Sequence, residues 1–301
     1  MEVSVSRTAE VKPMTLASLL REGISILSEG GIRNAEHEAV WIMDFALGAS
    51  RLTLRLEGQR QVTAEDRSRA MELFGRRAAR EPLQFILGTQ EFCGLEFEVG
   101  PAVLIPRPET ELLVEEVLRH CFSGSHPMIA DVGTGSGCIA VALAHALPTA
   151  SLYATDLSPA AVDLARSNAA RHAVEHRVVF LSGDLFEPLR GRGLEGRLAA
   201  VVSNPPYIAD GEMADLPPEV GSFEPNLALA GGVDGLALHR RLLDEAPEFL
   251  TPGGLLALEV GLGQADRLRH MALVGGGYDW IRTTPDAAGI ERVVVLEKVK
   301  R

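Results

Sequence analysis

The sequence predicts an α/β fold, with a mostly parallel sheet covered by helices on both faces and a small helical bundle ahead of it. Beyond residue 127, short continuously apolar runs alternate with amphipathic segments, which is typical of parallel strands buried on both faces. Residues 14–89 instead show apolar side chains at helical spacing throughout. A length of 301 residues is right for two such domains.

The composition indicates a globular chain. Hydrophobic residues make up 46% of it and charged residues 23%, which is enough apolar material for a sizeable core. No uninterrupted apolar run approaches the roughly 18 residues of a membrane span, and the first residues contain no apolar segment of a secretory signal. The three cysteines lack C-x-x-C spacing, so we expect no disulfide framework, no metal site and a cytoplasmic location.

The net charge of −12 is distributed unevenly along the chain. Residues 1–90 carry 12 basic and 12 acidic side chains, whereas the other 211 residues carry 17 basic and 29 acidic ones. Because nonspecific nucleic-acid binding depends on positive surface, this acidic part argues against stable nucleic-acid binding. Residues 51–80 are an exception, with eight arginines against four acids. This stretch is either a solvated helix face or a docking surface for an anionic partner.

Residues 14–89 are predicted to form a helical bundle that follows a flexible N-terminus at residues 1–13. Apolar residues recur at helical spacing in three stretches, at 16–27, 39–47 and 71–74. The predicted helix N-caps are Thr15, Asn34 and Thr63. Residues 90–105 then contain short apolar runs separated by Gly100-Pro101, which predicts a β-hairpin that connects the bundle to a second domain at residues 106–301.

The second domain is predicted to alternate strands and helices. The strands are expected at 128–132, 151–155, 177–181, 198–203, 255–260 and 292–297. The helices are expected at 137–147, 159–173, 235–249 and 264–273. A parallel sheet gathers the carboxyl ends of its strands at one edge, where ligands bind. We therefore expect the chemistry of this protein in the residues that follow each strand.

A glycine-rich loop follows the first of these strands. It reads Asp131-Val132-Gly133-Thr134-Gly135-Ser136-Gly137, and a predicted helix starts at once. Glycines let the backbone approach a ligand closely, and the helix N-terminus presents free N–H groups. The spacing differs from the G-x-G-x-x-G of dinucleotide sites, and the acid Asp131 suits a cationic ligand group, such as the sulfonium and amino end of S-adenosylmethionine. Another nucleotide and a purely structural turn remain alternatives.

Acids also follow the next two strands. Asp156, with Leu157 beside it, stands where a carboxylate can accept both hydroxyls of a ribose. Its alternative role is to cap the next helix, a role that Ser158 fits better. The third strand is followed by Asp184, Leu185 and Phe186. An acid and apolar side chains there would lie beside the amino group and ring of an adenine. Three acids after three successive strands favour a nucleoside pocket.

The segment Asn204-Pro205-Pro206-Tyr207 follows the fourth strand. Two prolines fix φ and remove two N–H donors, so the backbone carbonyls there can act as acceptors. The Asn204 amide oxygen adds an acceptor, and Tyr207 offers a flat face for stacking. This set suits a planar –NH2 group, either the exocyclic amine of a base or a carboxamide. The alternative is a turn with a buried tyrosine.

Taken together, the motifs resemble those of a known family. Besides the glycine loop and Asn204–Tyr207, the chain contains, in order, PLQFILG, LIPRPETE, GDLFEPL, FEPNLALAGGVDGL and LEVGLGQ. Over about residues 14–298 this combination resembles the bacterial peptide chain release factor N5-glutamine methyltransferases, the HemK family. The resemblance implies a class I S-adenosylmethionine-dependent methyltransferase fold, Rossmann-like with a mostly parallel seven-stranded sheet. It implies an enzyme that uses S-adenosyl-L-methionine to methylate the glutamine of the Gly-Gly-Gln motif in translation release factors. We expect this enzyme to be a monomer without membrane or stable nucleic-acid partners.

The resemblance also implies roles for individual residues. The residues added to the cofactor pocket, beyond the glycine loop, the acids and Asn204, are Leu104, Arg107 and Thr110. Arg107 has an alternative role as a structural clamp on acids. Glu224, which follows a proline-rich loop at 209–222 that could close over the substrate peptide, joins the Asn-Pro-Pro-Tyr motif in binding substrate. Because some relatives carry an aromatic residue where this chain has Leu185, Phe186 is expected to share the adenine contact. The helical bundle is expected to recognise the release factor.

The Asn-Pro-Pro-Tyr residues also indicate how a glutamine amide is made to react. Its nitrogen is a poor nucleophile because the lone pair is delocalised into the carbonyl. Hydrogen bonds to Asn204 Oδ1 and the Pro205 carbonyl would orient the –NH2, and Tyr207 would hold the amide plane, so these three residues catalyse by positioning. A DNA adenine-N6 methyltransferase could use the same motif on a flipped base, but it would need a basic cleft. A non-catalytic binding module would leave these acceptors idle.

Overall fold

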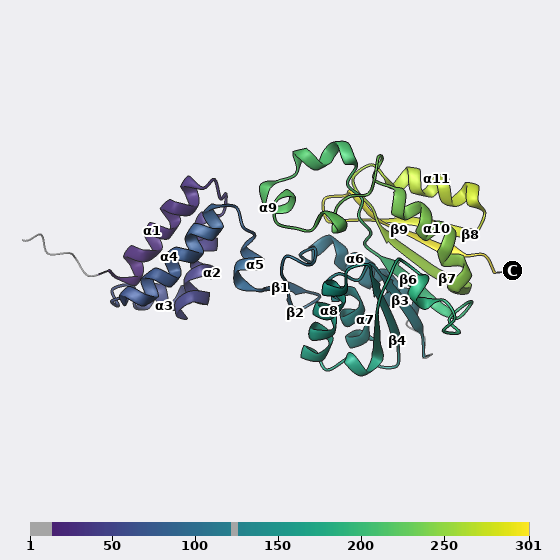
Figure 1. Cartoon of the computed structure of the whole chain (residues 1–301), viewed down its shortest axis with the longest axis horizontal. Coiled ribbons are helices and arrows are strands. Elements are labelled where there is room, and N and C mark those ends of the chain that lie inside the picture. Colours follow the sequence, from purple (N-terminus) through teal and green to yellow (C-terminus); the bar gives the residue numbers. More distant parts are fainter. Residues whose placement is uncertain (1–13, 122–125, 301) are drawn as a thin grey trace, which may run out of the picture. The chain divides into compact units, whose positions relative to one another are not determined.

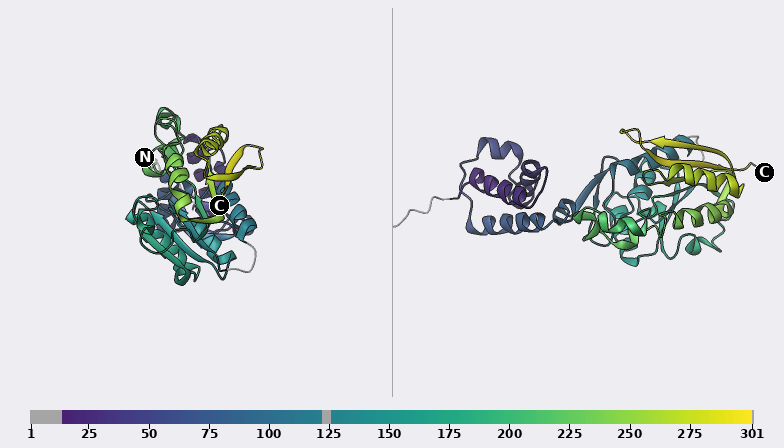
Figure 2. Two further views of the ribbon diagram at one scale, coloured as in Figure 1. Left: turned by 90° about the vertical axis from the view of Figure 1, so that its right-hand side faces the viewer. Right: turned by 90° about the horizontal axis from the view of Figure 1, so that it is seen from above.

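The computed structural model describes residues 14–121 and 126–300. The chain divides between residues 87 and 88 into two compact units, whose elements are labelled in Figure 1 and seen from two further directions in Figure 2. The predicted flexible segment at residues 1–13 lies outside the described residues. Within the two described ranges, no helix combines the length and apolarity that crossing a membrane requires.

The first unit is a helical bundle. Its helices are α1 (Leu16–Glu29), α2 (Ala35–Leu47), α3 (Arg51–Leu56), α4 (Ala64–Ala78) and α5 (Leu83–Leu87). Its core contains the fully buried side chains of Leu19, Leu27, Ile42, Met43 and Phe74. Thr15 and Thr63 cap α1 and α4 as predicted, each accepting a backbone N–H of the first turn. Asn34 is the N-cap residue of α2 as predicted, but its side chain makes no capping hydrogen bond, because its ψ of 37° is far from the extended backbone that places a side chain over the helix end.

Ion pairs within the first unit neutralise much of the arginine-rich stretch 51–80. Arg77 is buried, and its Nε donates to Glu38 at 2.5 Å. Further pairs join Arg60 to Glu57, Arg67 to Glu22, Arg69 to Asp66 and Arg76 to Glu81. Arg51 and Arg55 are exposed on α3, a helix without buried residues. The stretch is therefore not one continuous basic surface, since Arg77 belongs to the interior.

The second unit is built on a seven-stranded sheet with the order β5-β4-β3-β6-β7-β9-β8. The strands are β3 (Met128–Val132), β4 (Ser151–Asp156), β5 (Val178–Ser182), β6 (Leu198–Ser203), β7 (Leu250–Glu259), β8 (Tyr278–Pro285) and β9 (Glu291–Lys298). The first five run parallel, and β9 is antiparallel to both of its neighbours. This is the mostly parallel Rossmann-like sheet that was expected.

All six predicted strands are present, but the sequence prediction missed β8. The segment Tyr278–Pro285 mixes charged and hydroxyl side chains with apolar ones, so it lacks the continuous apolar run by which the central strands are recognised. It lies at the edge of the sheet and pairs only with β9. An edge strand contacts one neighbour and stays partly exposed, so its sequence carries a weaker signal.

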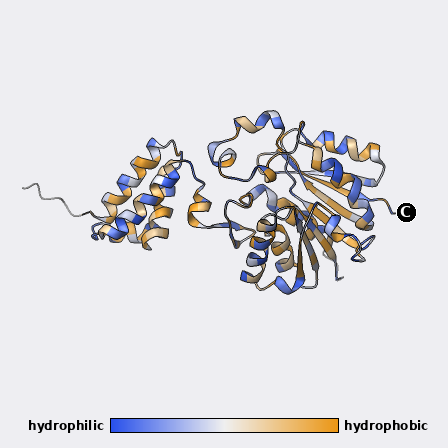
Figure 3. Ribbon diagram, viewed as in Figure 1, coloured by the Kyte–Doolittle hydropathy of each residue, from blue (hydrophilic) through white to orange (hydrophobic). Residues whose placement is uncertain are grey.

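Helices cover both faces of the sheet because successive strand residues point to opposite sides. The helices of this unit are α6 (Glu111–Cys121), α7 (Cys138–Ala146), α8 (Pro159–Arg171), α9 (Pro218–Gly221), α10 (Ala237–Phe249) and α11 (Ala265–Gly275). Ile129 and Leu152 pack into a core with α6, α7 and α8, whereas Ala130 and Leu256 pack into a second core with α10 and α11. Figure 3 shows the strands as the most continuously hydrophobic part of this unit. Short 3-10 turns are η1 (Pro108–Thr110), η2 (Glu175–Arg177), η3 (Glu187–Leu189), η4 (Asp210–Asp215) and η5 (Asn226–Ala228).

A β-hairpin opens the second unit, and it differs from the prediction in its turn. Strands β1 (Thr89–Phe92) and β2 (Leu95–Glu98) are joined at Cys93 and Gly94. Both turn residues have positive φ, 50° and 73°, which suits the twist of a two-residue hairpin. Gly100-Pro101 therefore lies after the hairpin rather than at its tip. Phe92 and Phe97 belong to the core with α6, α7 and α8, so the hairpin is packed into the second unit.

Candidate active site

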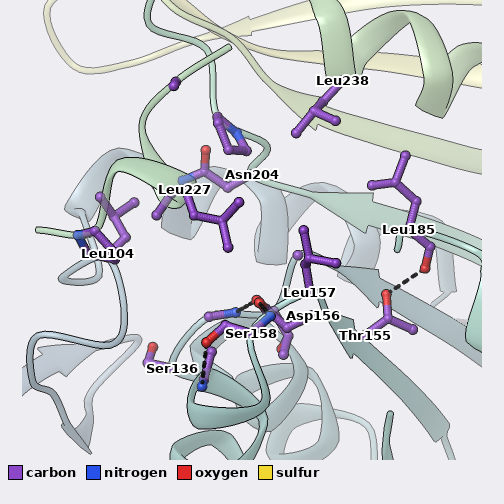
Figure 4. Close-up of a pocket in the computed structure, with 18 of the residues that line it drawn as sticks. Leu104, Ser136, Thr155, Asp156, Leu157, Ser158, Leu185, Asn204, Leu227 and Leu238 are labelled. Carbon is purple, nitrogen blue, oxygen red and sulfur yellow. Dashed lines mark hydrogen bonds between the residues drawn. The ribbon is translucent and has the colours of Figure 1, made fainter. Parts of the chain in front are cut away.

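A cavity of about 560 Å³ lies at the carboxyl ends of strands β3, β4, β5 and β6. It is lined by the residues directly after these strands, by the segment 102–110 and by parts of 225–241. Figure 4 shows side chains from each of these segments around the cavity. The predicted site residues that line it are Leu104, Arg107, Thr110, Gly133, Thr134, Gly135, Ser136, Asp156, Leu157, Asp184, Leu185, Asn204 and Pro206. The cavity thus lies at the edge of the sheet where the strand-end rule predicts the site.

The glycine loop is held in shape by backbone bonds to the neighbouring strand. Gly133 and Thr134 both donate their N–H to the Thr155 carbonyl, at 2.8 and 2.9 Å. Gly137, at a φ of 79°, ends the loop, and a Cβ there would lie 2.9 Å from that of Ala165 on α8. Only glycine allows both the left-handed backbone and this close helix contact. Gly137 allows the loop to pack closely against α8. It does not itself line the cavity.

Asp131 lies beneath this loop and is fully buried. Its Oδ2 accepts from the Thr134 hydroxyl at 2.6 Å and from the Ala140 N–H at 3.1 Å. Burial raises the pKa of this carboxyl to about 7, and within the described residues its Oδ1 has no hydrogen-bond partner. A buried carboxylate with one unsatisfied oxygen is stabilised by a cationic group placed nearby. Such a carboxylate fits the positively charged amino and sulfonium groups of S-adenosylmethionine, the ligand that the sequence predicts.

Asp156 bridges the loop and the start of the next helix. Its Oδ2 accepts from the Gly135 N–H at 2.8 Å and its Oδ1 from the Ser158 N–H at 2.9 Å. The capping role belongs to Ser158, whose hydroxyl accepts from the Ala161 N–H. Burial raises the pKa of Asp156. The carboxylate lines the cavity and keeps lone pairs for ribose hydroxyls, because each oxygen accepts only one of these bonds.

The residues after β5 divide between the cavity and the core. Leu185 lines the cavity with a φ of 44°, and its carbonyl accepts from the Thr155 hydroxyl at 2.9 Å, drawn in Figure 4. Phe186 is fully buried and stacks on Phe249, with ring centroids 5.0 Å apart. The expectation that Phe186 shares the adenine contact is therefore wrong: its ring fills the core under α10. Asp184 lines the cavity and also pairs with Arg241 at 2.9 Å.

Asn204 lines the cavity and is held by a hydrogen bond to a distant segment. Its Nδ2 donates to the Thr110 hydroxyl at 3.1 Å, and that hydroxyl donates to Glu259 Oε2 at 2.7 Å. Tyr207 is half-buried and lies with its hydroxyl 3.5 Å from Glu259 Oε1. Burial raises the pKa of Tyr207 well above its ordinary value. Of the four motif residues, Asn204 and Pro206 line the cavity. Pro205 and Tyr207 do not line it, so the substrate contacts predicted for these two residues remain predictions.

The glycines of 231–235 allow this loop to pack on the backbone of the Asn-Pro-Pro-Tyr segment. A Cβ at Gly231 would lie 2.8 Å from the Pro206 carbonyl oxygen, and one at Gly235 would lie 2.3 Å from the Tyr207 carbonyl oxygen. The same carbonyl of Tyr207 accepts from Gln264 Nε2 at 2.8 Å. These contacts explain why the glycines of the FEPNLALAGGVDGL motif are needed: side chains would push the two loops apart.

Arg107 fits both roles that the sequence left open. It lines the cavity, and its guanidinium donates to Glu224 at 2.5 Å. The Glu224 side chain is 1% exposed and does not line the cavity. The Glu224 carboxylate is held by Arg107, so its direct contact with substrate remains a prediction. Burial raises the pKa of Glu224, and the attraction of Arg107 opposes that shift.

Several residues of the site were not predicted from the sequence. Glu259 lies at the carboxyl end of β7, is 2% exposed, and has a pKa raised by burial to about 7. The strand-end rule that found the other acids also applies to it, and the motif LEVGLGQ contains it. Leu227, Leu238 and Arg241 line the cavity from the long segment after β6. Leu227 lies within the FEPNLALAGGVDGL motif, whereas nothing local in the sequence distinguishes Leu238 and Arg241. The path of this segment brings all three residues to the cavity.

Comparison with known proteins gives consistent matches for both units. Residues 18–88 match the family model of the PrmC N-terminal domain, and residues 108–216 match that of the methyltransferase small domain. The chain is 46% identical to the release factor glutamine methyltransferase of Geobacter sulfurreducens, over 89% of this chain and 91% of that protein. It is 44% identical to the protein of the same name from Moorella thermoacetica, over 93% and 97%.

One solved structure shows similarity at the level of the fold. The hMettl16 catalytic domain, solved in complex with MAT2A 3'UTR hairpin 6, superimposes with a TM-score of 0.57 at 16% sequence identity. The match covers 76% of this chain and 82% of that one. It supports the class I methyltransferase architecture of the sheet.

Proposed function

This chain belongs to the family of release factor glutamine methyltransferases, and we propose that it methylates the side-chain amide nitrogen of the glutamine in the Gly-Gly-Gln motif of translation release factors. S-adenosylmethionine is the methyl donor that this fold and family use. The observation that carries the proposal is the position of Asn204. It lines the same cavity as the glycine loop and Asp156, with Nδ2 held by Thr110.

The residues that would hold S-adenosylmethionine are the glycine loop with Asp131, the carboxylate of Asp156 and the side chain of Leu185. The bound cofactor supplies an electrophilic methyl group on a positively charged sulfur. Asp131 would favour the cationic end, because it is a buried carboxylate with an unsatisfied oxygen. Asp156 would accept ribose hydroxyls, as carboxylates after the second strand of such sheets do. Leu185 offers an apolar surface to the adenine.

On the substrate side, the chain acts by orienting the amide. Asn204 Oδ1 and the Pro205 carbonyl would accept the two amide hydrogens, while Tyr207 keeps the amide plane in place. This positioning matters because resonance makes an amide nitrogen a poor nucleophile. Fixing two reacting groups in a productive geometry lowers a barrier by up to roughly 7–11 kcal/mol. The chain needs no general base in this scheme, since a methylated amide cation loses its proton readily to water.

A DNA adenine-N6 methyltransferase is the rival activity, because an adenine amine is also a planar –NH2 group. The net charge of −12 does not favour binding of a nucleic acid. The deciding experiment incubates the full chain with labelled S-adenosylmethionine and either a release factor or duplex DNA. We expect label only in the release factor, on the glutamine of Gly-Gly-Gln. Label in the DNA would reverse the assignment.

We also propose that the helical unit recognises the release factor, and that the enzyme works as a monomer in the cytoplasm, where translation takes place. Support comes from the match of residues 18–88 to the PrmC N-terminal domain and from the cavity, whose lining residues all lie beyond residue 101. A chain that begins at Gly88 should keep its affinity for S-adenosylmethionine. Its kcat/KM on intact release factor should fall by at least about tenfold, because remote binding energy positions the reacting amide.

Two measurements complete the test of the helical unit. A short peptide containing Gly-Gly-Gln should be a poor substrate for the full chain and for the truncated chain alike. Arg51→Glu with Arg55→Glu, on exposed α3, should slow association with the release factor if this part of the arginine-rich stretch docks an acidic surface. Arg77 is unsuitable for charge reversal because its buried pair with Glu38 stabilises the bundle. Unchanged kcat/KM after truncation would leave the helical unit with a structural role only.

A further inference from the structure

Three side chains far apart in the sequence form one chain of hydrogen bonds at the cavity wall. Glu259 Oε2 accepts from the Thr110 hydroxyl at 2.7 Å, and the same hydroxyl accepts from Asn204 Nδ2 at 3.1 Å. Thr110 and Glu259 are both 2% exposed, so water does not replace these bonds easily. The other oxygen of Glu259 lies 3.5 Å from the Tyr207 hydroxyl. One buried carboxyl therefore contacts, directly or through one hydroxyl, two residues of the Asn-Pro-Pro-Tyr segment.

The direction of these bonds follows from counting hydrogens. A threonine hydroxyl has one hydrogen and two lone pairs, and an ionised carboxylate can only accept. When Glu259 is ionised, Thr110 must donate to it, and only the lone pairs of the hydroxyl remain for Asn204. The amide group of Asn204 that faces Thr110 must then be the Nδ2 donor. Its Oδ1 is left as an acceptor, and no protein group in the described part of the chain donates to it.

We propose that Glu259 is a positioning residue for methyl transfer: acting through Thr110, it fixes the side-chain amide of Asn204 so that Oδ1, and not Nδ2, is presented to the substrate. The inference rests on the proposed function, in which Oδ1 accepts an N–H of the glutamine amide. Without an obligate acceptor at position 259, the Thr110 hydroxyl is free to donate to Asn204 Oδ1. The amide can then turn over and present Nδ2, and two –NH2 groups that face each other cannot form a hydrogen bond.

The groups around Glu259 indicate that this control depends on pH. Burial raises the pKa of Glu259 to about 7 and nearby Glu109 adds to the shift, while Thr110, Arg292 and Tyr207 oppose it. Arg292 is itself paired with Asp286 at 2.9 Å. On α10, His239 Nε2 donates a hydrogen bond to the backbone carbonyl of Glu259. Burial lowers the pKa of this histidine to about 4, so its side chain is neutral near pH 7. A protonated Glu259 can donate to Thr110, and the direction of the bonds is then no longer fixed.

The test compares Glu259→Gln and Thr110→Val with the wild-type full chain, on intact release factor. Each variant should lower kcat by about 10- to 100-fold, within the range of couplings between neighbouring groups. For Glu259→Gln, whose side chain does not line the cavity, the Kd for S-adenosylmethionine, measured by calorimetry, should stay within about twofold. The double variant should be no worse than either single one, because both break the same chain of bonds. Wild-type kcat should rise with pH through an apparent pKa near 7, and kcat of Glu259→Gln should not.

A matched control comes from another buried acid of the same unit. Glu116 on α6 is fully buried and is held by Arg119 at 2.6 Å and by Thr284 at 2.6 Å, away from the cavity. Glu116→Gln should lower the melting temperature and leave kcat and its pH profile unchanged. If Glu259→Gln fails to fold, Thr110→Ser against Thr110→Val decides the matter. The serine keeps the hydroxyl, and it should be at least tenfold more active than the valine.

The outcomes separate failure of the inference from failure of the proposed function. A wild-type chain that does not methylate release factor contradicts the function itself. A wild-type chain that methylates release factor, together with folded Glu259→Gln of undiminished kcat, overturns the role of Glu259. Additive losses of kcat in the double variant would also overturn the role of Glu259, and so would a pH dependence of kcat in Glu259→Gln equal to that of the wild type. A glutamate with only a structural role would change stability without coupling to Thr110 and without affecting the pH dependence of kcat.

Discussion

The two sides of the cavity are built in different ways. The glycine-loop side consists of residues 131–137, Asp156 and 184–185, and its hydrogen bonds join residues close in sequence, such as Gly135 to Asp156 across 21 positions. The Asn204 side consists of Thr110, Asn204–Tyr207 and Glu259. Its hydrogen bonds join Asn204 to Thr110, which are 94 positions apart in the sequence, and Thr110 to Glu259, which are 149 positions apart. The first side follows from three consecutive strands, β3, β4 and β5, with the helices between them, whereas the second side also requires β6, β7 and the segment before α6.

This difference has a functional counterpart. The glycine-loop side offers N–H groups, carboxylates and an apolar surface to a cofactor, and its parts are fixed by backbone bonds between adjacent strands. The Asn204 side offers acceptors to a substrate amide, and its key side chain is fixed by other side chains. Substitutions on the first side should therefore change cofactor affinity, and substitutions on the second should change turnover.

The largest expected effect is that of Asn204→Ala. Removal of a positioned hydrogen-bonding group from a transition state costs about a hundred- to a thousand-fold in kcat, and we expect a loss of this size. The Kd for S-adenosylmethionine should stay within a few-fold of wild type, because the cofactor is held mainly by the other side. Single-turnover rates with saturating release factor measure the loss directly. Near wild-type turnover would contradict the assigned role of Asn204 and, with it, the division between the two sides.

The same division decides how much the sequence could predict. The glycine loop, Asp156 and six of the seven strands of the sheet can be predicted because their signals lie within a few residues of one another. Glu259 lies within the LEVGLGQ motif, but its hydrogen bond to Thr110 cannot be predicted from the sequence, because it depends on how β7 lies beside the segment 102–110. The expectation that Phe186 contacts the adenine fails because neighbouring residues after a strand alternate between cavity and core, so that Leu185 lines the cavity and the Phe186 ring is buried.

Asp156→Ala should have the next largest effect, on the other side of the cavity. Loss of a charged acceptor costs about 1.5–3 kcal/mol, which corresponds to about 10- to 150-fold in the Kd for S-adenosylmethionine. Asp156→Asn should weaken binding less, since its remaining oxygen can still accept from Gly135 N–H. Calorimetry gives the affinities, and kcat at saturating cofactor should change little. Unchanged affinity in Asp156→Ala would mean that the carboxylate serves only to hold the loop and Ser158.

A smaller effect should distinguish the two apolar residues after β5. Leu185→Ala removes apolar surface from the cavity and should weaken S-adenosylmethionine binding by about 1 kcal/mol, roughly fivefold. Phe186→Leu removes part of a core ring stacked on Phe249 and should lower the free energy of unfolding by about 1–2 kcal/mol with little change in affinity. Calorimetry and denaturant unfolding measure the two quantities. Weaker S-adenosylmethionine binding in Phe186→Leu, together with unchanged binding in Leu185→Ala, would instead indicate that Phe186 contacts the adenine.

The smallest effect concerns stability and arises from Asp131. Its pKa is raised in the folded protein from an ordinary value of 3.8 to about 7, chiefly by burial. Between these two values the folded state holds a proton that the unfolded state has released, so this residue makes the protein less stable as pH rises from about 4 to 7. Asp131→Asn removes that loss, and its melting temperature relative to wild type should increase between pH 5 and pH 8 by a few degrees.

S-adenosylmethionine should oppose the trend, because a cation near Asp131 favours the ionised form. Wild-type affinity for the cofactor should therefore rise with pH up to about 7, and that of Asp131→Asn should not. Parallel melting curves for the two proteins across this pH range would show that Asp131 does not carry a raised pKa, and the cationic end of the cofactor would need another partner on the glycine-loop side.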